Sequence, residues 1–358
     1  MNADFWQGRR VFLTGHTGFK GSWLSLWLQE LGAEVTGYSL PPPTKPSLFE
    51  EAKVAGGMTS IIGDICDLRS LIQAMSRSRP EVIIHMAAQS LVRASYVDPI
   101  ETYRTNILGT VSVLEASRSL TGLRAIINVT TDKCYENREW PWAYRESDPL
   151  GGYDPYSSSK ACSEIVSAAY RSSFFNPEEY AQHGVALASA RAGNVVGGGD
   201  WARDRLIPDI LSAFEVGEPV RVRNPEAVRP WQHVLEPLSG YLTLAERLYH
   251  EGPRYSCAWN FGPAEQDARS VRWIVEMMAN FWGNDAQWVL DDNQHPHEAT
   301  YLKLDTSQAR TALNWHPVLD LQRTLKWVVD WAQAHREKRD LRQFSINQIR
   351  QYQRLQLK

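Results

Sequence analysis

Tyr156 and Lys160 are separated by three residues, a spacing that supports acid–base chemistry when both side chains lie on one helix. Residues four apart share a helix face, and the preceding Asp154 and Pro155 are typical of an N-cap and a first helical position. Since a nearby ammonium favours the phenolate, we expect the pKa of Tyr156 to be lowered, so that the phenol is a general base toward a hydroxyl group. The same spacing also occurs by chance on solvated helices, so the neighbouring segments must decide between the two interpretations.

Three further polar residues, Thr131, Asp132 and Lys133, directly follow the β-rich run 125–129. The hydroxyl of Thr131 could share a hydrogen bond with a substrate hydroxyl, and Asp132 and Lys133 add two titratable groups. The competing interpretation is a capping aspartate beside a solvated lysine. The predicted catalytic residues are Thr131, Asp132, Lys133, Tyr156 and Lys160.

A glycine-rich loop follows the β-rich run 11–14 and opens a helical pattern at 19–31. Glycines in this context let the backbone turn tightly and approach a pyrophosphate, which then lies at the helix N-terminus, where free N–H groups favour anions. A purely structural turn is the alternative. The residues of this predicted cofactor loop are Gly15, Thr17, Gly18, Phe19, Lys20 and Gly21.

The acidic residue that commonly binds the cofactor ribose about 20 residues further on is missing, because 36–39 reads Thr-Gly-Tyr-Ser. This position therefore does not distinguish NAD from NADP. Asp64, after the β-rich run 60–62, could instead accept a hydrogen bond from the adenine amino group. An N-cap or turn aspartate is the other interpretation of Asp64.

The elements that must position these residues alternate between β-rich runs and helical patterns up to about residue 190. This alternation predicts an α/β fold with a Rossmann-type doubly wound parallel sheet. Beyond it, glycines and prolines predict a smaller, mixed C-terminal substrate-binding lobe. We expect a dinucleotide-binding domain at 1–190 and, at 191–358, mainly the lobe, with some segments returning to the first domain. Gly15, Ala87, Thr131 and Asn194 then meet at the carboxyl ends of the strands, in one site.

Composition and charge exclude several classes of protein. The 358 residues carry 38 Lys and Arg against 41 Asp and Glu, a formal charge of −3, so no global basic field would hold nucleic acid or an anionic membrane. The four cysteines lack C-x-x-C spacing, which argues against a disulfide framework or a thiolate metal site. With no apolar run long enough to cross a membrane, we expect a soluble, cytoplasmic, metal-free protein.

Several strings spread over nearly the whole chain resemble the extended short-chain dehydrogenase/reductases that act on nucleotide sugars. They are T-G-x-x-G-x-x-G at 14–21, His85-x-Ala-Ala-Gln89, Asn106, Thr131-Asp132 and Tyr156-x-x-x-Lys160. Longer strings resemble the nucleotide-sugar 4,6-dehydratases, in particular the branch that acts on CDP-glucose. These are found at 14–23, 131–137, 193–201 and 229–234.

The resemblance implies a hydro-lyase that forms a 4-keto-6-deoxy sugar from CDP-glucose with a tightly bound, recycled NAD. Tyr156 would take the proton of the 4-hydroxyl, Thr131 would position it, and Asp132 would be the acid for the 6-hydroxyl. The hydride would pass from C4 to NAD and back to C6. Lys133 stands where the commoner sugar dehydratases have the glutamate that removes the C5 proton. A lysine base with a lowered pKa and an ammonium that stabilises the enolate are both open interpretations.

The resemblance also implies a set of binding residues. Those expected to hold NAD outside the glycine loop are Asp64, Ile65, Ala87, Ala88, Gln89, Asn106, Tyr156 and Lys160. Those expected to hold the nucleotide sugar are Asn194, Arg205, Leu206, Arg221, Arg229, His233, Asn260 and Tyr301. The arginines and His233 form a local basic cluster for the diphosphate, although scattered arginines are more often simply solvated.

The sequence also predicts an oligomeric assembly and leaves two rival functions open. The helices around Asn106 and after Tyr156 resemble those of a helical-bundle dimer interface, which implies a homodimer or a higher homo-oligomer. Another nucleotide-sugar dehydratase or a 4-epimerase is the nearest rival, but an epimerase needs no acid/base pair such as Asp132 and Lys133. A regulatory protein that binds a dinucleotide without turnover is the rival from a different class.

Overall fold

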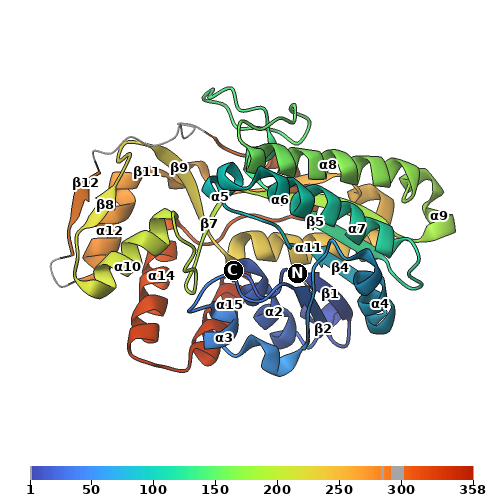
Figure 1. The fold of residues 1–358 in the computed structure, drawn as a ribbon, viewed down its shortest axis with the longest axis horizontal. Coiled ribbons are helices and arrows are strands. Elements are labelled where there is room, and N and C mark those ends of the chain that lie inside the picture. Colours follow the sequence, from blue (N-terminus) through green and yellow to red (C-terminus); the bar gives the residue numbers. More distant parts are fainter. Residues whose placement is uncertain (1, 284–285, 292–301, 358) are drawn as a thin grey trace.

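The computed structural model describes residues 2–283, 286–291 and 302–357. Its centre is a seven-stranded sheet in which every neighbouring pair is parallel, with the order β10-β6-β5-β4-β1-β2-β3 (Figure 1). The strands are β1 (Arg10–Thr14), β2 (Glu34–Ser39), β3 (Thr59–Ile62), β4 (Val82–His85), β5 (Ala125–Val129), β6 (Ala186–Ala192) and β10 (Ala258–Phe261).

Helices cover both faces of this sheet because its buried strands carry apolar side chains on both sides. On β1, Val11 and Leu13 pack toward one layer of helices, whereas Phe12 packs toward the other. The first layer holds α2 (Phe19–Glu30), α11 (Leu235–Glu251) and α15 (Leu341–Gln356). The second holds α4 (Leu68–Ser78), α7 (Gly109–Ser117) and α8 (Pro155–Ser173). The doubly wound parallel architecture expected from the sequence is confirmed.

A smaller lobe lies beside this sheet, on the left of Figure 1. In it β9 (Val228–His233) pairs in parallel with β7 (Asn194–Val196) and antiparallel with β11 (Ala268–Ser270), and β8 (Val220–Val222) pairs with β12 (Trp288–Leu290). Its helices are α10 (Leu206–Val216), α12 (Val271–Trp282) and α14 (Leu321–Arg336). They enclose a separate apolar cluster that includes Phe214 and Trp282, so the lobe is mixed, as expected.

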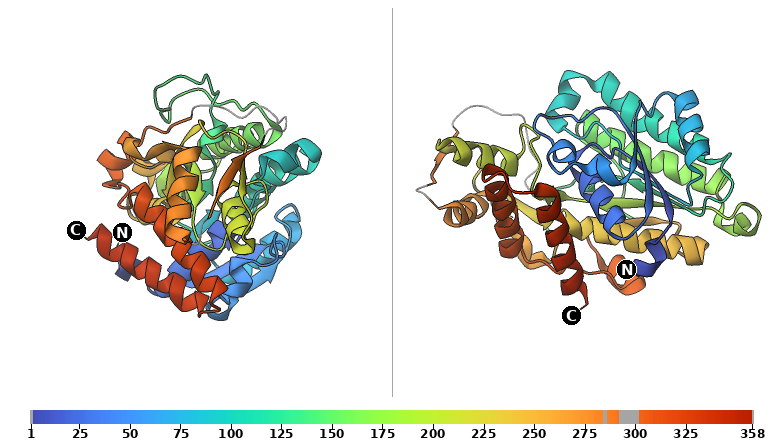
Figure 2. Two further views of the ribbon diagram at one scale, coloured as in Figure 1. Left: turned by 90° about the vertical axis from the view of Figure 1, so that its left-hand side faces the viewer. Right: turned by 90° about the horizontal axis from the view of Figure 1, so that it is seen from below.

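Segments beyond residue 190 contribute to the main sheet as well as to the lobe. Strand β10 pairs with β6 at the edge of the sheet, and α11 packs on β5 and β6. Helix α15 packs on α2 and brings the C-terminal end of the chain close to the N-terminal end, as both figures show (Figure 2). A division into two domains at residue 190 stays a prediction.

The remaining elements are short. They are the helices α1 (Ala3–Trp6), α3 (Leu48–Glu51), α5 (Val92–Val97), α6 (Pro99–Tyr103), α9 (Tyr180–His183) and α13 (Ser307–Leu313). Short 3₁₀ turns lie at Val54–Gly57, Asp132–Cys134, Pro177–Glu179, Gly252–Tyr255 and Glu265–Asp267, and a π-turn, Arg104–Leu108, joins α6 to α7. Within the described ranges, no helix is both long and apolar enough to cross a membrane.

Candidate active site

The glycine loop turns between β1 and α2 where only glycine fits at two positions. Gly15 has a φ of +77°, and a Cβ there would lie 2.7 Å from the backbone nitrogen of Ala87. A Cβ on Gly21 would lie 2.0 Å from the carbonyl oxygen of Gly15. The hydroxyl of Thr14 accepts hydrogen bonds from the backbone N–H groups of Met86 and Ala87, which ties the ends of β1 and β4 together.

Gly18 differs from these two glycines because the protein itself does not require it. Its φ is −77°, and a Cβ there would meet only the carbonyl oxygen of Gly15, at an ordinary contact distance of 3.4 Å. Gly18 is the N-cap of α2 and offers no side chain to the free N–H groups of the first turn. An open backbone face beside those groups fits a pyrophosphate, so the loop can hold a dinucleotide.

Two other predicted cofactor residues hold the loop and its surroundings in place. The hydroxyl of Thr17 donates to the carbonyl of Leu40 (2.8 Å) and lies 2.9 Å from that of Ser39, which fixes the loop to the end of β2. Phe19, the first residue of α2, packs against the core of the first helix layer.

Asp64 makes the contacts of a turn residue. Its carboxylate accepts a hydrogen bond from the N–H of Cys66 (2.8 Å) and forms an ion pair with Arg104 (2.9 Å). Ile65 is buried, and its side chain fills the space over Gly109. A contact between Asp64 and adenine stays a prediction.

Asn106 lies in the π-turn and connects the segment after β4 to α8. Its side-chain oxygen accepts from the N–H of Gln89 (2.9 Å), and its amide donates to the carbonyl of Gln89 (2.9 Å) and the hydroxyl of Ser159 (2.8 Å). These bonds set the course of the backbone through Ala87, Ala88 and Gln89 at the mouth of the site. Inserted π-turns are frequent at functional sites.

The predicted catalytic residues come together at the carboxyl end of β5. Asp154 caps α8 by accepting from the N–H of Ser157, with Pro155 as the first helical residue, and so presents Tyr156 and Lys160 on one face, both buried. The ammonium of Lys160 donates to the carbonyl of Val129 (3.0 Å).

Thr131 links the phenol of Tyr156 to the next residue of the cluster. Its hydroxyl is hydrogen-bonded to the phenol and donates to the carboxylate of Asp132 (2.9 Å). Asp132 is buried, and a Cβ on Gly193 would lie 2.8 Å from its carboxylate, so the glycine leaves room for this group. Lys133 is half-buried beside them.

The pKa of Tyr156 departs in the direction opposite to our expectation. Burial of the phenol raises its pKa to about 12; the hydrogen bond between the phenol and Thr131 opposes this shift, and the Asp132 carboxylate adds to it. Desolvation also lowers the pKa of Lys160 to about 8. Loss of hydration therefore sets the direction in which the pKa of Tyr156 is shifted, which the spacing to Lys160 alone could not indicate.

Arg205, one of the predicted substrate residues, lies close enough to the catalytic group for its charge to act on Tyr156. It forms an ion pair with Asp200 (3.0 Å), donates to the hydroxyl of Ser90 (3.2 Å) and acts electrostatically on Tyr156. Leu206 follows it as the first residue of α10. The remaining candidates of the lobe are Asn194, half-buried on β7, Arg229, half-buried on β9, and Arg221, exposed on β8.

The prediction that His233 belongs to a basic phosphate cluster is wrong. Its ring is fully buried, 6.1 Å from that of Trp23 and 5.5 Å from that of Trp327 between ring centroids, and Nδ1 accepts from the N–H of Leu235. Burial lowers the pKa of His233 to about 3. A neutral imidazole within an aromatic cluster supplies no charge for a diphosphate.

Asn260 uses its side chain to hold loops together. Its oxygen accepts from the phenol of Tyr135 (2.8 Å), and its amide donates to the carbonyls of Tyr144 (2.9 Å) and Asp305 (3.1 Å). The amide is thus occupied by the protein, contrary to the prediction of a substrate contact. Tyr301 lies outside the described residues.

One group in the site was missed by the sequence reasoning, and the contact that another group makes was not predicted. Lys20 was assigned only to the cofactor loop, yet its amine donates to the phenol of Tyr241 (3.2 Å). The signal was a charged residue in the first turn of a mainly apolar helix. Beneath Lys160, Glu164 forms a buried ion pair with Arg191 (2.9 Å). Its position one turn after Lys160 was the available signal.

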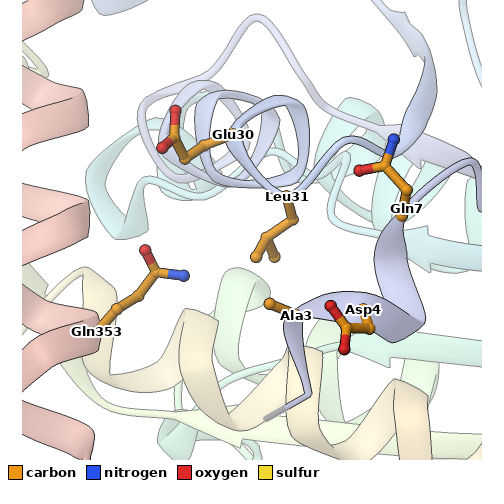
Figure 3. Close-up of a pocket in the computed structure, with 6 residues that line it drawn as sticks. All are labelled: Ala3, Asp4, Gln7, Glu30, Leu31 and Gln353. Carbon is orange, nitrogen blue, oxygen red and sulfur yellow. The ribbon is translucent and has the colours of Figure 1, made fainter.

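A hollow at the opposite end of α2 from the glycine loop lies apart from this site (Figure 3). It is lined by Ala3, Asp4, Gln7, Glu30, Leu31 and Gln353. Glu30 forms an ion pair with Arg350, and the lining contains neither a nucleophile with a base nor a cluster of cations. The hollow is therefore no part of the catalytic arrangement.

Comparison with known proteins agrees with this arrangement. The family model described as GDP-mannose 4,6 dehydratase matches residues 12–328. A CDP-glucose 4,6-dehydratase of Salmonella typhimurium is 57% identical over 352 residues, which cover 98% of this chain and 98% of that protein.

Two solved structures share the fold at low sequence identity. A UDP-glucose 4-epimerase from Thermotoga maritima, with UDP-glucose, has a TM-score of 0.78 at 22% identity and covers 91% of this chain and 99% of its own. A dTDP-glucose 4,6-dehydratase from Bacillus anthracis, in complex with NAD, has a TM-score of 0.75 at 22% identity and covers 92% and 98%. The fold, the clustered Tyr156 and Lys160, and the family match over most of the chain agree, and the chain belongs to the GDP-mannose 4,6-dehydratase family of nucleotide-sugar 4,6-dehydratases.

Proposed function

We propose that this protein is an NAD-dependent hydro-lyase that converts CDP-D-glucose to CDP-4-keto-6-deoxy-D-glucose. The observation that carries the proposal is the buried group Thr131, Asp132 and Tyr156 at the carboxyl end of β5, of which Asp132 acts electrostatically on Lys20 of the glycine loop. The choice of CDP-glucose rests on the 57% identical relative that bears this activity in its name.

The residues that would hold NAD are those of the glycine loop and the β4 end. The first-turn N–H groups of α2 would bind the pyrophosphate at Gly18, and the backbone of Ala87 to Gln89 would flank the nicotinamide side. When bound, NAD would supply a hydride acceptor for C4 of the sugar and a hydride donor for C6, and the positive charge of its oxidised nicotinamide would favour the phenolate of Tyr156.

Tyr156 takes the proton of the 4-hydroxyl in the first step. Thr131, hydrogen-bonded to the phenol, holds the 4-oxygen and the phenol in register. Lys160 lies one turn further along α8 than Tyr156. Its ammonium favours the phenolate, the form of Tyr156 that can accept the proton of the 4-hydroxyl. The product of this step is a 4-ketone, which acidifies the hydrogen at C5.

Elimination of water needs a base at C5 and an acid at C6. Lys133, at the position of the usual glutamate, removes the C5 proton, and the C–H electron pair forms a C4–C5 double bond. Asp132, which must enter this step protonated, donates its proton to the 6-hydroxyl and becomes the carboxylate; the C6–O bond breaks, and water leaves. Arg205, with Asn194, Leu206, Arg221 and Arg229 of the lobe, meets the nucleoside diphosphate.

Incubation of the protein with CDP-, UDP-, dTDP- and GDP-glucose tests the function. We expect loss of water, measured by mass spectrometry, to be fastest with CDP-glucose, and deuterium placed at C4 to reappear at C6. Solvent deuterium at C6 in place of the C4 label, or inversion at C4 with no loss of water, would overturn the proposal; the second result is that of an epimerase. Binding of NAD with no sugar chemistry would indicate a regulatory protein.

Substitution of the C5 base provides a narrower test. Lys133→Met should stop the reaction after C4 oxidation, so that C5 hydrogen no longer exchanges with solvent. Unchanged dehydration by this variant would assign the base to another group.

We also propose that the protein forms a homodimer through α5, α6 and α8, which contact one another along the molecule (Figure 1). Exposed apolar side chains gather there, notably Val97, Ile100 and Ile165. Exposed apolar side chains on neighbouring helices favour an interface, and a second copy of the chain is the occupant that the family resemblance implies. The four free cysteines support a reducing compartment, the cytoplasm.

A further inference from the structure

Lys20 and Tyr241 form a second lysine–tyrosine pair beside Tyr156 and Lys160. The amine of Lys20 donates to the phenol of Tyr241 at 3.2 Å and lies 5.3 Å from the centre of its ring. Tyr241 is fully buried in α11, whereas Lys20 comes from the first turn of α2. The two pairs influence each other, because the charge of Lys160 acts on Lys20 and that of Tyr156 acts on Tyr241.

The surroundings make the charge of Lys20 costly. The charged groups that act on it are the cations Lys160 and Arg205 and the carboxylate of Asp132, and its hydrogen bond goes to a neutral phenol. Desolvation lowers the pKa of Lys20 to about 7. A methionine would occupy similar space without this cost, so a titratable amine retained here points to a role in the chemistry.

The proposed dehydration creates negative charge on O4, the oxygen that Tyr156 and Thr131 would hold. Lys20 is near enough to this group to interact electrostatically with Asp132 and Lys160. When the C5–H bond breaks, its proton goes to the base, its electron pair forms the C4–C5 double bond, and the electrons of the C4 carbonyl move onto O4. The enolate charge disappears when the C6–O bond breaks and Asp132 supplies the proton that leaves as water. A fixed positive charge stabilises such an oxyanion most effectively when the charge is in place before the oxyanion forms.

We propose that Lys20, held in position by Tyr241, supplies positive charge that stabilises the developing oxyanion at O4 of the sugar. This inference rests on the proposed function and adds to it a residue outside the tyrosine–lysine motif. It assigns Lys20 a role distinct from that of Lys133, because stabilising the enolate and accepting the C5 proton are separate tasks.

The test compares Lys20→Met, which removes the charge, with Lys20→Arg, which retains it, and Tyr241→Phe, which releases the amine. We expect Lys20→Met, assayed at saturating NAD because Lys20 belongs to the predicted cofactor loop, to lower kcat about 10²-fold near pH 6, with KM for CDP-glucose unchanged within about threefold. The Lys20→Met protein should melt no lower than the original, since a costly charge is gone. Lys20→Arg should recover part of kcat, and Tyr241→Phe should lose about tenfold.

The pH profile provides a readout that a structural role would not change. Because the ammonium form is lost as pH rises through the pKa of Lys20, the advantage of the original protein over Lys20→Met should shrink between about pH 6 and about pH 9. The advantage of Lys20→Arg over Lys20→Met should not, because arginine stays charged.

Different outcomes separate this inference from the proposed function. Equal kcat for Lys20→Met and the original protein, or a deficit of the same size at every pH, would overturn the role of Lys20. Failure of the original protein to dehydrate CDP-glucose would instead overturn the proposed function. Lys20→Met should still exchange C5 hydrogen with solvent, more slowly, whereas Lys133→Met should not; complete loss of exchange in Lys20→Met would make Lys20 the base.

Discussion

Asp132 and Tyr156 have different proposed roles: Asp132 is the acid for the 6-hydroxyl, and Tyr156 is the base for the 4-hydroxyl. The carboxylate is buried, accepts from Thr131 and lies against the backbone at Gly193. A protonated Asp132 would therefore donate its proton to a substrate hydroxyl in surroundings that exclude water. Its loss should affect water release and leave C4 oxidation intact.

Asp132→Asn should therefore slow dehydration about 10²- to 10⁴-fold, because the amide has no proton to give to the departing hydroxyl. Mass spectrometry of the bound sugar should show the 4-keto compound that has not lost water. Asp4→Asn, an exposed change in α1, is the matched control and should behave like the original protein. Normal dehydration by Asp132→Asn would assign the acid elsewhere.

Residue identity and spacing were sufficient to predict Tyr156 and Lys160 on one helix face with Asp154 as the cap. They were not sufficient to predict pKa values, because these depend on which distant segments pack around a side chain. The pKa of Tyr156 is raised because its surroundings exclude water, and His233 is neutral because Trp23 and Trp327, far apart in the chain, surround it. Sequence order does not indicate which distant segments meet.

At the scale of elements, the start of α2 offers a sharp test of cofactor binding. Gly18→Ala should leave the melting temperature within a few degrees, since a Cβ there meets only Gly15 at 3.4 Å. It should nevertheless weaken binding of NAD at least tenfold, because the methyl occupies the face that a pyrophosphate approaches.

Gly56→Ala is the control for this change, since nothing lies within 4 Å of a Cβ at that position. It should change neither stability nor the Kd for NAD, measured by titration calorimetry. Equal affinities for Gly18→Ala and Gly56→Ala would contradict a pyrophosphate at this turn.

Helix α11 is joined to the C-terminal elements through Glu236. Its carboxylate accepts from the N–H groups of Val318 (3.0 Å) and Leu319 (2.7 Å) and from the phenol of Tyr352 (2.6 Å). Burial raises the pKa of Glu236 from 4.5 to about 7. The folded protein thus holds this proton more tightly than the unfolded chain, so the contribution of Glu236 to stability is full below about pH 4.5 and declines toward about pH 7.

Glu236→Gln should remove that decline. Between about pH 5 and about pH 8 the free energy of unfolding of the original protein should fall relative to the variant, by up to about 3 kcal/mol. Urea denaturation at the two pH values measures the difference. Parallel curves for the two proteins would show that Glu236 titrates normally.

The strands up to residue 190 could be predicted because parallel, buried strands are short apolar runs between helical patterns. The structure has β1, β3 and β5 within one residue of the expected runs 11–14, 60–62 and 125–129. The π-turn at Asn106 and the return of β10 to the sheet were not located, because both depend on tertiary contacts and not on a local pattern.

For the whole molecule, the face formed by α5, α6 and α8 predicts the assembly. Val97 and Ile100 are 87% and 80% exposed there. Val97→Glu combined with Ile100→Glu should convert a dimer into a monomer, because the carboxylates would be buried without partners. Light scattering coupled to gel filtration measures the mass.

Val216→Glu is the corresponding control, since this residue is 71% exposed at the end of α10 in the smaller lobe. It should leave the dimer intact. A monomeric original protein, or a double variant that remains dimeric, would exclude this face as the interface.

Strand β10 also constrains how the chain acquires its shape during synthesis. Its residues pair with β6 but are encoded after β7, α10, β8 and β9 of the lobe, so the sheet stays open along β6 until that strand has left the ribosome. An unpaired strand edge invites association with other chains, and pairing between such distant segments is slow to form. A nascent protein stalled before Ala258 would therefore depend on chaperones, and a nucleotide-binding module excised at residue 190 would lack the strand that completes its sheet.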